Sequence, residues 1–353
     1  VIMPSGIRIT NPQFVSDSPD PVFINPEDPF IRENNVFSYP VFCPKTDSNR
    51  VILMLHGLNE RSWSKYLVWA YRLAEAISSY VILFPISFHI NRSPQSWSNP
   101  RTMTDFMGLR NSITGKIFNS SFVNIALSNR LTDDPMRFFN SGYRTVNDIV
   151  KLLTSVKEGS HPVLPASQKI DIFSYSIGAF ISEIMIMGNP ENLFSESRLF
   201  IFCGGSVFSN MNGSSKLIMD KRAFDRVYNY YMKDFEDQIQ GNGRLPEYLR
   251  SSRIGLAFRS MIDFSKLARF RERILLKLRD QINVIGLKQD TVIPVNGTIE
   301  TLKPTGRNDS VRVMDFGYQY SHENPFPVLN GRLAEEVDRC FDLVFGRAAA
   351  FLI

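Results

Sequence analysis

An apolar, strand-like run that passes through a short serine and glycine turn into a helical run constrains this fold most. The run is Lys169–Ser174, and the helical pattern continues over Ile177–Met187. A turn this sharp forces its central residue into strained backbone angles and brings strand and helix close together, so the flanking residues must be small. Ser174 and Gly178 meet that need, which predicts Ser176 at the apex of the turn.

The rest of the chain alternates short β-branched runs with longer segments of helical period. This alternation is typical of βαβ units, so we expect an α/β fold with a mostly parallel, twisted sheet and helices on both faces. The other expected strands are Arg50–Leu55, Tyr80–Ile86, Leu199–Cys203, Ile282–Leu287 and Val311–Phe316, with Val36–Phe42 as an edge-strand candidate. The other expected helices are Tyr143–Val156, Leu333–Phe345 and Trp63–Ser79, the last with a stripe of Leu67, Ala70, Ala74 and Ile77.

Two long stretches interrupt the alternation. Residues 91–140 contain no strand-like run, and residues 206–280 are mostly of helical period. Because structureless loops this long are uncommon inside a compact domain, we expect both stretches to lie over one end of the sheet. The predicted organisation is an irregular N-terminal segment (1–35), a core (36–205 and 281–353) with an excursion (91–140), and a helical cap (206–280).

The composition excludes several classes of protein. The chain holds three cysteines and no CxxC pair, so it has neither a disulfide framework nor a recognisable zinc motif. Its 40 basic and 35 acidic residues give a net charge of +5, which is no argument for nucleic acid. A phosphate-binding glycine loop and an HExxH helix are both missing from the sequence, and we therefore expect no cofactor and no metal.

Membrane and targeting signals are weak in the sequence. No apolar run approaches the roughly 20 residues that span a bilayer, so we expect a soluble protein without a transmembrane segment. The N-terminus shows no basic segment followed by an apolar one, which favours a cytoplasmic location. Because the chain begins with Val1 rather than Met, a leader removed before Val1 stays open, and with it secretion.

Three loops together resemble those of a known family. A small-x-Ser-x-Gly turn between strand and helix is similar to the nucleophile elbow of the α/β-hydrolase superfamily, in which a serine, an acid and a histidine follow in that order. Asp290, in Lys288-Gln289-Asp290-Thr291-Val292-Ile293-Pro294, matches the position of the acid, and His322, in the loop 317–325, matches that of the base. The resemblance covers roughly 36–345. It implies an α/β-hydrolase-type sheet with a cap insertion, and a catalytic triad of Ser176, Asp290 and His322.

Each position has a competing interpretation. Asp290 is also a plausible turn former ahead of Pro294, and Asp315, at the end of the last expected strand, is the reserve candidate for the acid. His322 could be an exposed loop imidazole. Among the four histidines, His89 and His161 do not occupy the place of a base in such a fold.

The turn His56-Gly57-Leu58 follows the first expected buried strand. In the family that this chain resembles, such a turn supplies one backbone amide to an oxyanion hole, and the residue after the nucleophile supplies the other. The resemblance therefore implies the amides of Leu58 and Ile177, whereas His56 is expected to orient the turn by hydrogen bonding. The elbow has Ser174 where the family most often has glycine, and a Gly-Gly-Gly extension is lacking, so no subfamily is indicated.

Two compositional features of the predicted cap and excursion remain. The stretch Arg244–Arg279 is rich in Arg and Lys, which we interpret as a solvated helical face, with an anionic substrate or surface as the alternative. Phenylalanines are frequent in the two long stretches. Most are expected in the core, and some are candidates to line an apolar acyl or alcohol pocket: Phe106, Phe118, Phe122, Phe138, Phe139, Phe208, Phe224 and Phe235.

These features together predict a serine hydrolase. It would cleave a carboxylic ester, thioester or amide through an acyl-enzyme, and its partner would be a small acyl substrate with an apolar part rather than nucleic acid. Two alternatives stay open: an acyltransferase with the same triad, and a catalytically silent binding protein with the same fold. The sequence does not indicate an oligomeric state.

Overall fold

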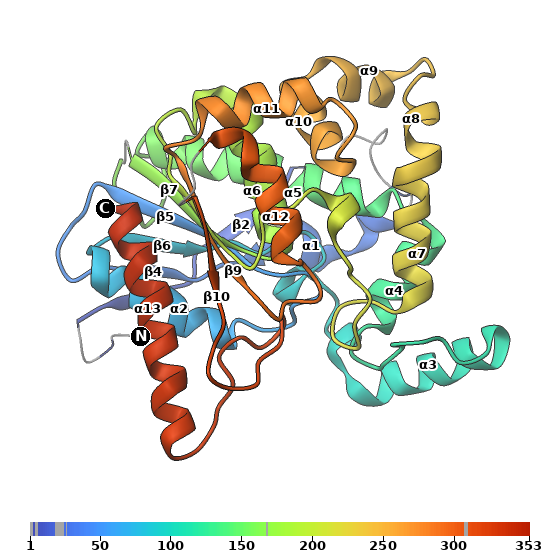
Figure 1. Cartoon of the computed structure of the whole chain (residues 1–353), viewed down its shortest axis with the longest axis horizontal. Coiled ribbons are helices and arrows are strands. Elements are labelled where there is room, and N and C mark those ends of the chain that lie inside the picture. The colour runs from blue at the N-terminus through green and yellow to red at the C-terminus, as the bar shows by residue number, and fades with distance from the viewer. Residues whose placement is uncertain (1–2, 4–5, 18–24, 26, 167–168, 307–309) are drawn as a thin grey trace.

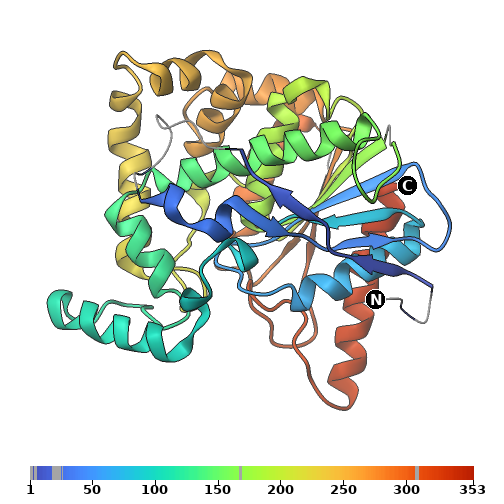
Figure 2. The same cartoon turned by 180° about the vertical axis from the view of Figure 1, so that it is seen from behind.

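An eight-stranded sheet forms the centre of the computed structural model, which describes residues 3, 6–17, 25, 27–166, 169–306 and 310–353 (Figures 1 and 2). The strand order is β1-β4-β6-β5-β7-β8-β9-β10. β4 is antiparallel to β1 and β6, and the other neighbours are parallel. The strands are β1 (Arg8–Thr10), β4 (Val41–Cys43), β5 (Arg50–Leu55), β6 (Tyr80–Leu83), β7 (Lys169–Tyr175), β8 (Leu199–Phe202), β9 (Ile282–Leu287) and β10 (Val311–Met314). A second sheet pairs β2 (Gln13–Val15) with β3 (Val36–Ser38).

Helices cover both faces of the main sheet (Figure 1). α2 (Ser64–Ile77) and α13 (Arg332–Leu352) pack on one face, while α5 (Arg137–Lys157) and α6 (Ile177–Gly188) contribute to the core of the other. The other described α-helices are α1 (Arg32–Asn35), α3 (Pro100–Thr114), α4 (Ile125–Asp133), α7 (Lys221–Asn229), α8 (Phe235–Gln238), α9 (Arg244–Ser251), α10 (Arg253–Ile262), α11 (Ala268–Lys277) and α12 (Val295–Leu302). Short 3₁₀ turns lie at Asp28–Phe30, Ile90–Arg92, Gln95–Ser98, Pro190–Asn192, Phe208–Asn210 and Lys303–Thr305, and Tyr230–Asp234 is a π-helix.

The mostly parallel sheet with helices on both faces confirms the predicted α/β-hydrolase type of fold. Parallel strands covered on both faces read as unbroken apolar runs, which is why β5 and β9 have the predicted bounds. The predicted strand Val36–Phe42 is instead two strands in two sheets, β3 and β4. Pro40 lies between them and has no backbone N–H to donate to a ladder.

The N-terminal segment is not irregular throughout, and this part of the prediction was wrong. β1 forms the edge of the main sheet, and β2 pairs with β3. Both pairings depend on partners distant in the sequence, which local composition does not reveal. Residues 1–2, 4–5, 18–24 and 26 of this segment lie outside the described residues, and with them most of the N-terminus on which the leader argument depends.

A buried polar cluster holds this segment against the body of the molecule, and we call it the N-terminal clamp. Arg92 Nη2 donates to Asp148 Oδ2 over 2.7 Å, and Arg92 Nε donates to Asn34 Oδ1 over 3.0 Å. Ser16 Oγ donates to Asp148 Oδ1 over 2.7 Å and accepts from Arg144 Nε over 3.0 Å. The clamp therefore ties residues 16 and 34 to α5 and to the 3₁₀ turn that contains Arg92.

The buried face of α2 differs from the predicted stripe. Tyr66, Trp69, Ala70, Leu73 and Ala74 are buried, whereas Leu67 is 38% exposed. Large aromatic rings fill the space between α2, α13 and the sheet, with Trp69 packed edge-on against Tyr175. The stripe drawn from aliphatic residues alone missed these rings.

The two long stretches are helical in the described structure. Within 91–140, α3 projects from the body of the molecule (Figures 1 and 2), and the segment 206–280 holds α7 to α11. Most basic residues of Arg244–Arg279 are exposed, in agreement with a solvated face. Arg271 is the buried exception, because its guanidinium donates to the carbonyls of Ser260 and Phe264 over 2.5 and 2.6 Å. Among the described residues, no helix combines the length and hydrophobicity needed to cross a bilayer.

Candidate active site

The sharp turn predicted at Ser176 is present at the end of the central strand β7. Ser176 has φ 58° and ψ −124°, a strained conformation for a residue with a side chain, and α6 begins at the next residue. The turn brings α6 against the end of β5. A Cβ at Gly178 would lie 2.8 Å from the carbonyl oxygens of Leu55 and His56, so only glycine fits there.

Ser176, His322 and Asp290 meet at the carboxyl edge of the sheet. Ser176 Oγ lies 2.7 Å from His322 Nε2, and His322 Nδ1 lies 2.7 Å from Asp290 Oδ2. The backbone amides of Val292 and Ile293 donate to Asp290 Oδ1, each over 2.9 Å. Asp290 is thus a turn former through one oxygen and a hydrogen-bond partner of His322 through the other.

The reserve acid Asp315 is not brought to His322. Its exposed carboxylate accepts from Gln289 Nε2 over 2.9 Å and from the hydroxyl of Tyr320 over 3.1 Å. His322 is buried rather than exposed on a loop. Of the two candidate acids, only Asp290 is in a position to orient the imidazole.

Leu58 and Ile177 lie in the two turns that meet at the serine. In the β5–β7 register Leu55 is opposite Ser174, which sets the turn after β5 beside the turn that contains Ser176. Within the described residues, neither amide donates to a protein acceptor. Leu58, Ile177 and Ser176 also line one cavity.

His56 is fixed as a neutral imidazole. Its Nε2 accepts from the amide of Ile86 over 2.9 Å, so the proton is on Nδ1, which donates to the carbonyl of Gly57 over 2.8 Å. Burial, reinforced by His89, holds the pKa of His56 well below its usual value. This geometry suits a residue that orients the turn and does not transfer protons.

Sequence analysis missed a hydrogen-bonded chain behind the site. The amide of Gly57 donates to the hydroxyl of Tyr66 over 2.9 Å, and that hydroxyl donates to Glu60 Oε1 over 2.7 Å. Lys65 pairs with the same oxygen over 2.5 Å and donates to the carbonyl of Glu323 over 3.0 Å. The chain links the turn after β5 to the loop that carries His322.

Tyr175 supports His322 directly. The two rings stack with centroids 5.4 Å apart and planes inclined by 19°, and the Tyr175 hydroxyl donates to the backbone carbonyl of His322. Lys65 Nζ lies 4.7 Å from the centroid of the Tyr175 ring. Tyr175 lies inside the predicted turn, so its place next to Ser176 could have marked it as a functional candidate. Lys65 and Tyr66 lie on α2, for which the sequence predicted a helix with a buried stripe but no functional residue.

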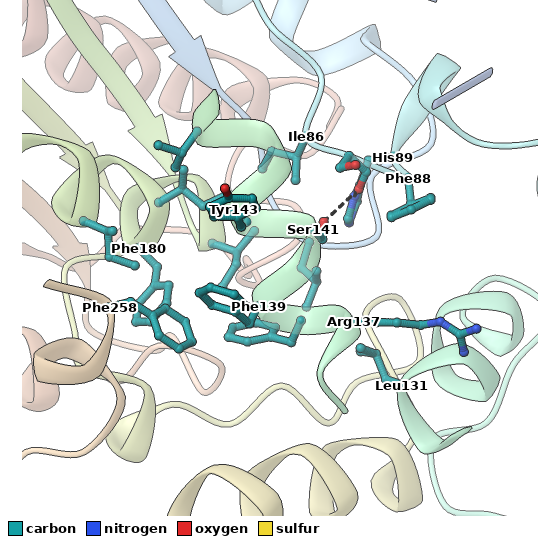
Figure 3. Close-up of a pocket in the computed structure, with 18 of the residues that line it drawn as sticks. Ile86, Phe88, His89, Leu131, Arg137, Phe139, Ser141, Tyr143, Phe180 and Phe258 are labelled. Atoms are coloured by element: carbon teal, nitrogen blue, oxygen red, sulfur yellow. Dashed lines mark hydrogen bonds between the residues drawn. The ribbon is translucent and has the colours of Figure 1, made fainter. Parts of the chain in front are cut away.

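Two apolar cavities adjoin the serine. The first, the serine cavity, measures about 400 Å³ including its part open to solvent. Ser176 lines it with the adjacent Ile177 and with residues of four other segments: Leu58, Phe138, Phe208, Met211, Gly213, Ile218, Met219, Phe224, Val292 and Ile293. The second, the aromatic cavity, measures about 810 Å³ on the same basis (Figure 3). Leu58, Phe138 and Ile177 line both cavities, so these three residues lie between the two.

Several predicted pocket aromatics do line these cavities and others do not. Phe138, Phe208 and Phe224 line the serine cavity, and Phe138 and Phe139 line the aromatic cavity. Phe118, by contrast, is 73% exposed. Among the described residues, no group of three or more His, Cys, Asp or Glu side chains is arranged to hold a metal ion.

Comparisons with known proteins give remote structural similarities and one family. No curated protein matches the sequence. The structure is similar to an esterase from Pyrobaculum calidifontis (13% identity, 97% of this chain and 84% of that chain, TM-score 0.47). It is also similar to carboxyl esterase 2 from Tuber melanosporum (9%, 100% and 89%, TM-score 0.48) and to the esterase domain of a Rhodothermus marinus protein (9%, 97% and 98%, TM-score 0.44). A family model matches residues 9–353, and the chain therefore belongs to the family of unknown function DUF6051.

Proposed function

We propose that this protein is a serine hydrolase that cleaves carboxylic esters through an acyl-enzyme. One observation carries the proposal: an unbroken line of contacts from Ser176 Oγ to His322 Nε2 and from His322 Nδ1 to Asp290 Oδ2, each 2.7 Å long. The line begins at a side chain that faces an apolar cavity. A nucleophile, a base and an orienting acid in this order are the requirements of acyl transfer.

In the proposed reaction, Ser176 Oγ attacks the ester carbonyl and His322 Nε2 takes its proton. Asp290 holds the tautomer with the proton on Nδ1 and stabilises the imidazolium that forms. The carbonyl oxygen becomes an oxyanion that accepts hydrogen bonds from the amides of Leu58 and Ile177. His322 then gives its proton to the leaving alkoxide, and a water molecule, activated by the same imidazole, releases the acid from Ser176.

The lining of the serine cavity supports a substrate with an apolar part. Phe208, Met211, Ile218, Met219 and Phe224 reach this cavity from the segment 206–280. We propose that this segment acts as a cap over Ser176, with 36–205 and 281–353 as the core. Such a lining favours esters of alkyl or aryl groups over charged substrates, because an unpaired charge in an apolar cavity is costly.

Acyl transfer to an alcohol or amine is the second candidate, and the burial of the site favours it. Ser176 and His322 are 4% and 3% exposed, so bulk water has little access to the acyl-enzyme. Hydrolysis and transfer are separated by product analysis when alkanols are added during turnover. If the alkyl ester forms in place of the acid at millimolar alkanol, transfer is the main reaction.

The third possibility, a silent binding protein, is weakened by the geometry. A silent site would be expected to lose either the hydrogen bond between serine and histidine or the opening beside the serine. Here the Ser176–His322 distance is 2.7 Å, and Ser176 lines a cavity. The site thus retains what the chemistry needs.

The test is Ser176→Ala, assayed with p-nitrophenyl esters and with a fluorophosphonate probe. We expect turnover to fall by at least about 10⁴-fold and labelling to disappear. Ser182→Ala is the matched control, because Ser182 is a buried serine on α6, the helix that follows Ser176, and its hydroxyl donates to the carbonyl of Gly178. The control should keep its labelling. Undiminished labelling of Ser176→Ala would remove Ser176 from the role of nucleophile.

A further inference from the structure

His89 is a buried histidine that the proposed reaction does not use. It follows β6, is 5% exposed and lines the aromatic cavity (Figure 3). Its two neighbours, Phe88 and Ile90, have φ values of 67° and 51°. Positive φ is strained for bulky residues and above all for a β-branched one, and such strain concentrates where a side chain must be held in a particular direction.

The hydrogen bonds of His89 fix its protons. Nδ1 lies 2.9 Å from the carbonyl oxygen of Ser87, which can only accept, so Nδ1 carries a proton. Burial lowers the pKa of His89 to about 4, and the ring is neutral at physiological pH. Nε2 therefore presents a lone pair, and within the described residues no protein group donates to it.

The other polar side chains around this end of the cavity bond to protein partners. Ser87 Oγ donates to Asn34 Oδ1, and Ser141 Oγ donates to the carbonyl of Ser87. Arg130 pairs with Asp28 over 2.9 Å, and Arg137 pairs with Asp133 over 2.6 Å. Within the described residues, His89 Nε2 is thus a buried acceptor without a protein donor, on a residue that lines a mostly apolar cavity.

The cavity connects this acceptor to the proposed reaction site. Leu58 and Ile177, whose amides would bind the oxyanion, line the same cavity as His89. Figure 3 shows His89 and Ser141 at one end of the cavity, with Phe180 and Phe258 at the other. A molecule that fills the cavity from Leu58 and Ile177 therefore meets mostly apolar walls and, at His89, a ring nitrogen to which no described protein group donates.

We propose that His89 Nε2 accepts a hydrogen bond from a hydroxyl or N–H group on the part of the substrate that occupies the aromatic cavity. The preferred esters then carry an apolar chain with one donor at a fixed distance from the ester carbonyl. This assignment of a substrate class rests on the proposed function. A site that hydrogen-bonds a hydroxyl or N–H group of its substrate discriminates strongly against an analogue without that group, because the buried polar atom of the protein is then left unpaired.

Two series of esters test the proposal, because a donor could enter on either side of the ester. One holds p-nitrophenyl esters of ω-hydroxy acids, and the other holds monoacetates of α,ω-diols, each of about six to twelve carbons. Every compound is compared with its counterpart without the hydroxyl. In one series we expect the ratio of kcat/KM values, hydroxylated over plain, to rise at least about tenfold at one chain length.

Two substitutions at His89 separate the acceptor from the rest of the ring. In His89→Asn the amide takes the place of Nδ1 and can still donate to Ser87, but nothing replaces the lone pair of Nε2. In His89→Gln the amide oxygen can take the place of Nε2. We expect His89→Asn to abolish the maximum in the ratio and His89→Gln to restore part of it.

A matched control in the same cavity is Ile184→Val, which removes a methylene group without changing any hydrogen bond. It should change both members of each pair by the same factor. A flat ratio in both series of the unmodified protein overturns the proposal, and so does a maximum that survives in His89→Asn.

A binding measurement keeps the proposal apart from the proposed function. Should no ester be hydrolysed, the hydrolase assignment fails, and His89 is tested by the ¹⁵N resonance of its Nε2. Primary alkanols and their methyl ethers are the probes, since only the alkanol donates. We expect the resonance, assigned with His89→Asn, to move with an alkanol and not with its ether. Equal responses to both, or none, overturn the proposal.

Discussion

This protein contains two buried polar clusters, each built around an aspartate, and the two differ in role. The N-terminal clamp joins Arg92, Arg144 and Asp148, and the candidate site joins Ser176, His322 and Asp290. Arg92 and Asp148 are 0% and 4% exposed, and Ser176 and His322 are 4% and 3% exposed. Burial alone therefore does not distinguish the candidate site from the clamp.

The difference lies in how each cluster ends. In the clamp, the charged side chains of Arg92 and Asp148 pair with each other. Asp148 accepts a hydrogen bond from Arg92 on one carboxylate oxygen and from the hydroxyl of Ser16 on the other. Burial lowers the pKa of Arg92 to about 10, which still leaves it charged at neutral pH. The line through His322 ends instead at a hydroxyl that faces a cavity. In the proposed reaction a proton moves from Ser176 to His322, whereas the clamp only holds segments together.

The largest effect that should separate the two clusters is that of Asp290→Asn. An amide at this position can donate to His322 Nδ1 and so favours the tautomer that cannot take a proton from Ser176. We expect kcat to fall by about 10⁴-fold, with little change in the free energy of unfolding. Steady-state kinetics and chemical denaturation measure the two quantities. The control Asp315→Asn, at the exposed reserve position, should change kcat by less than about threefold, and the reverse ranking would reassign the acid.

The clamp should show the opposite response. Arg92→Met leaves the carboxylate of Asp148 buried without its charged partner, and we expect the free energy of unfolding to fall by about 3–5 kcal/mol. The double substitution Arg92→Met with Asp148→Leu removes both charges and should recover part of that loss, which a double-mutant cycle in denaturant measures. The comparison breaks down if Arg92→Met lowers the kcat of the folded protein as much as Asp290→Asn does.

A smaller effect tests the hydrogen-bonded chain behind the site, which combines both roles. Tyr66→Phe removes the acceptor for the amide of Gly57 and leaves that buried amide unpaired, at a cost of about 1–3 kcal/mol in unfolding free energy. Because this turn carries Leu58, we also expect kcat to fall about tenfold at an unchanged KM. Tyr71→Phe is the matched control on the same helix, since its hydroxyl bonds only to Glu75 near solvent. An equal loss in both variants would argue against the chain.

The positions within the candidate site could be predicted because they depend on local patterns. A strand that enters a small-residue turn predicts Ser176 by itself. Asp290 and His322 were predicted because their loops resemble those of the α/β-hydrolases, and loops that follow parallel strands lie at one edge of the sheet. The support behind them could not be predicted in this way. Tyr66 and Lys65 act through contacts with Gly57 and Glu323, and their own segment shows no motif.

The same limit explains the errors in the fold. β5 and β9 were predicted with their observed bounds because strands buried on both faces are apolar throughout. β1 and β2 have three residues each and exist only through pairing with β4 and β3. Their composition shows nothing of those partners. The clamp likewise joins residues 16 and 148, whose proximity is a property of the folded chain.

The smallest effect concerns pH and three buried histidines that lie outside both clusters: His56, His89 and His161. His161, away from the site, accepts from the amides of Val163 and Leu164 at Nδ1, as His56 accepts from Ile86 at Nε2. Protonation of either ring would break these bonds. Burial lowers the pKa values of His161 and His89 to about 4, from 6.5 in the unfolded chain, so the unfolded state binds more protons between those values. The stability is complete above pH 6.5 and is lost as the pH falls toward 4.

From pH 6.5 to pH 5.5, each of these two histidines should lower the free energy of unfolding by about 1 kcal/mol, and His56 should act in the same direction. His161→Asn keeps an acceptor near the amides of Val163 and Leu164 but does not titrate. Chemical denaturation at pH 6.5 and pH 5.5 should therefore show that the free energy of unfolding falls by about 1 kcal/mol less in His161→Asn than in the unmodified protein. Above pH 7.5 the two proteins should have the same pH dependence. Parallel pH profiles at low pH would mean that His161 is already protonated in the folded protein. In that case, a hydrogen bond from a backbone amide to a ring nitrogen is not sufficient to keep a buried histidine neutral. The argument would then fail for His56, which accepts from the amide of Ile86, as well as for His161.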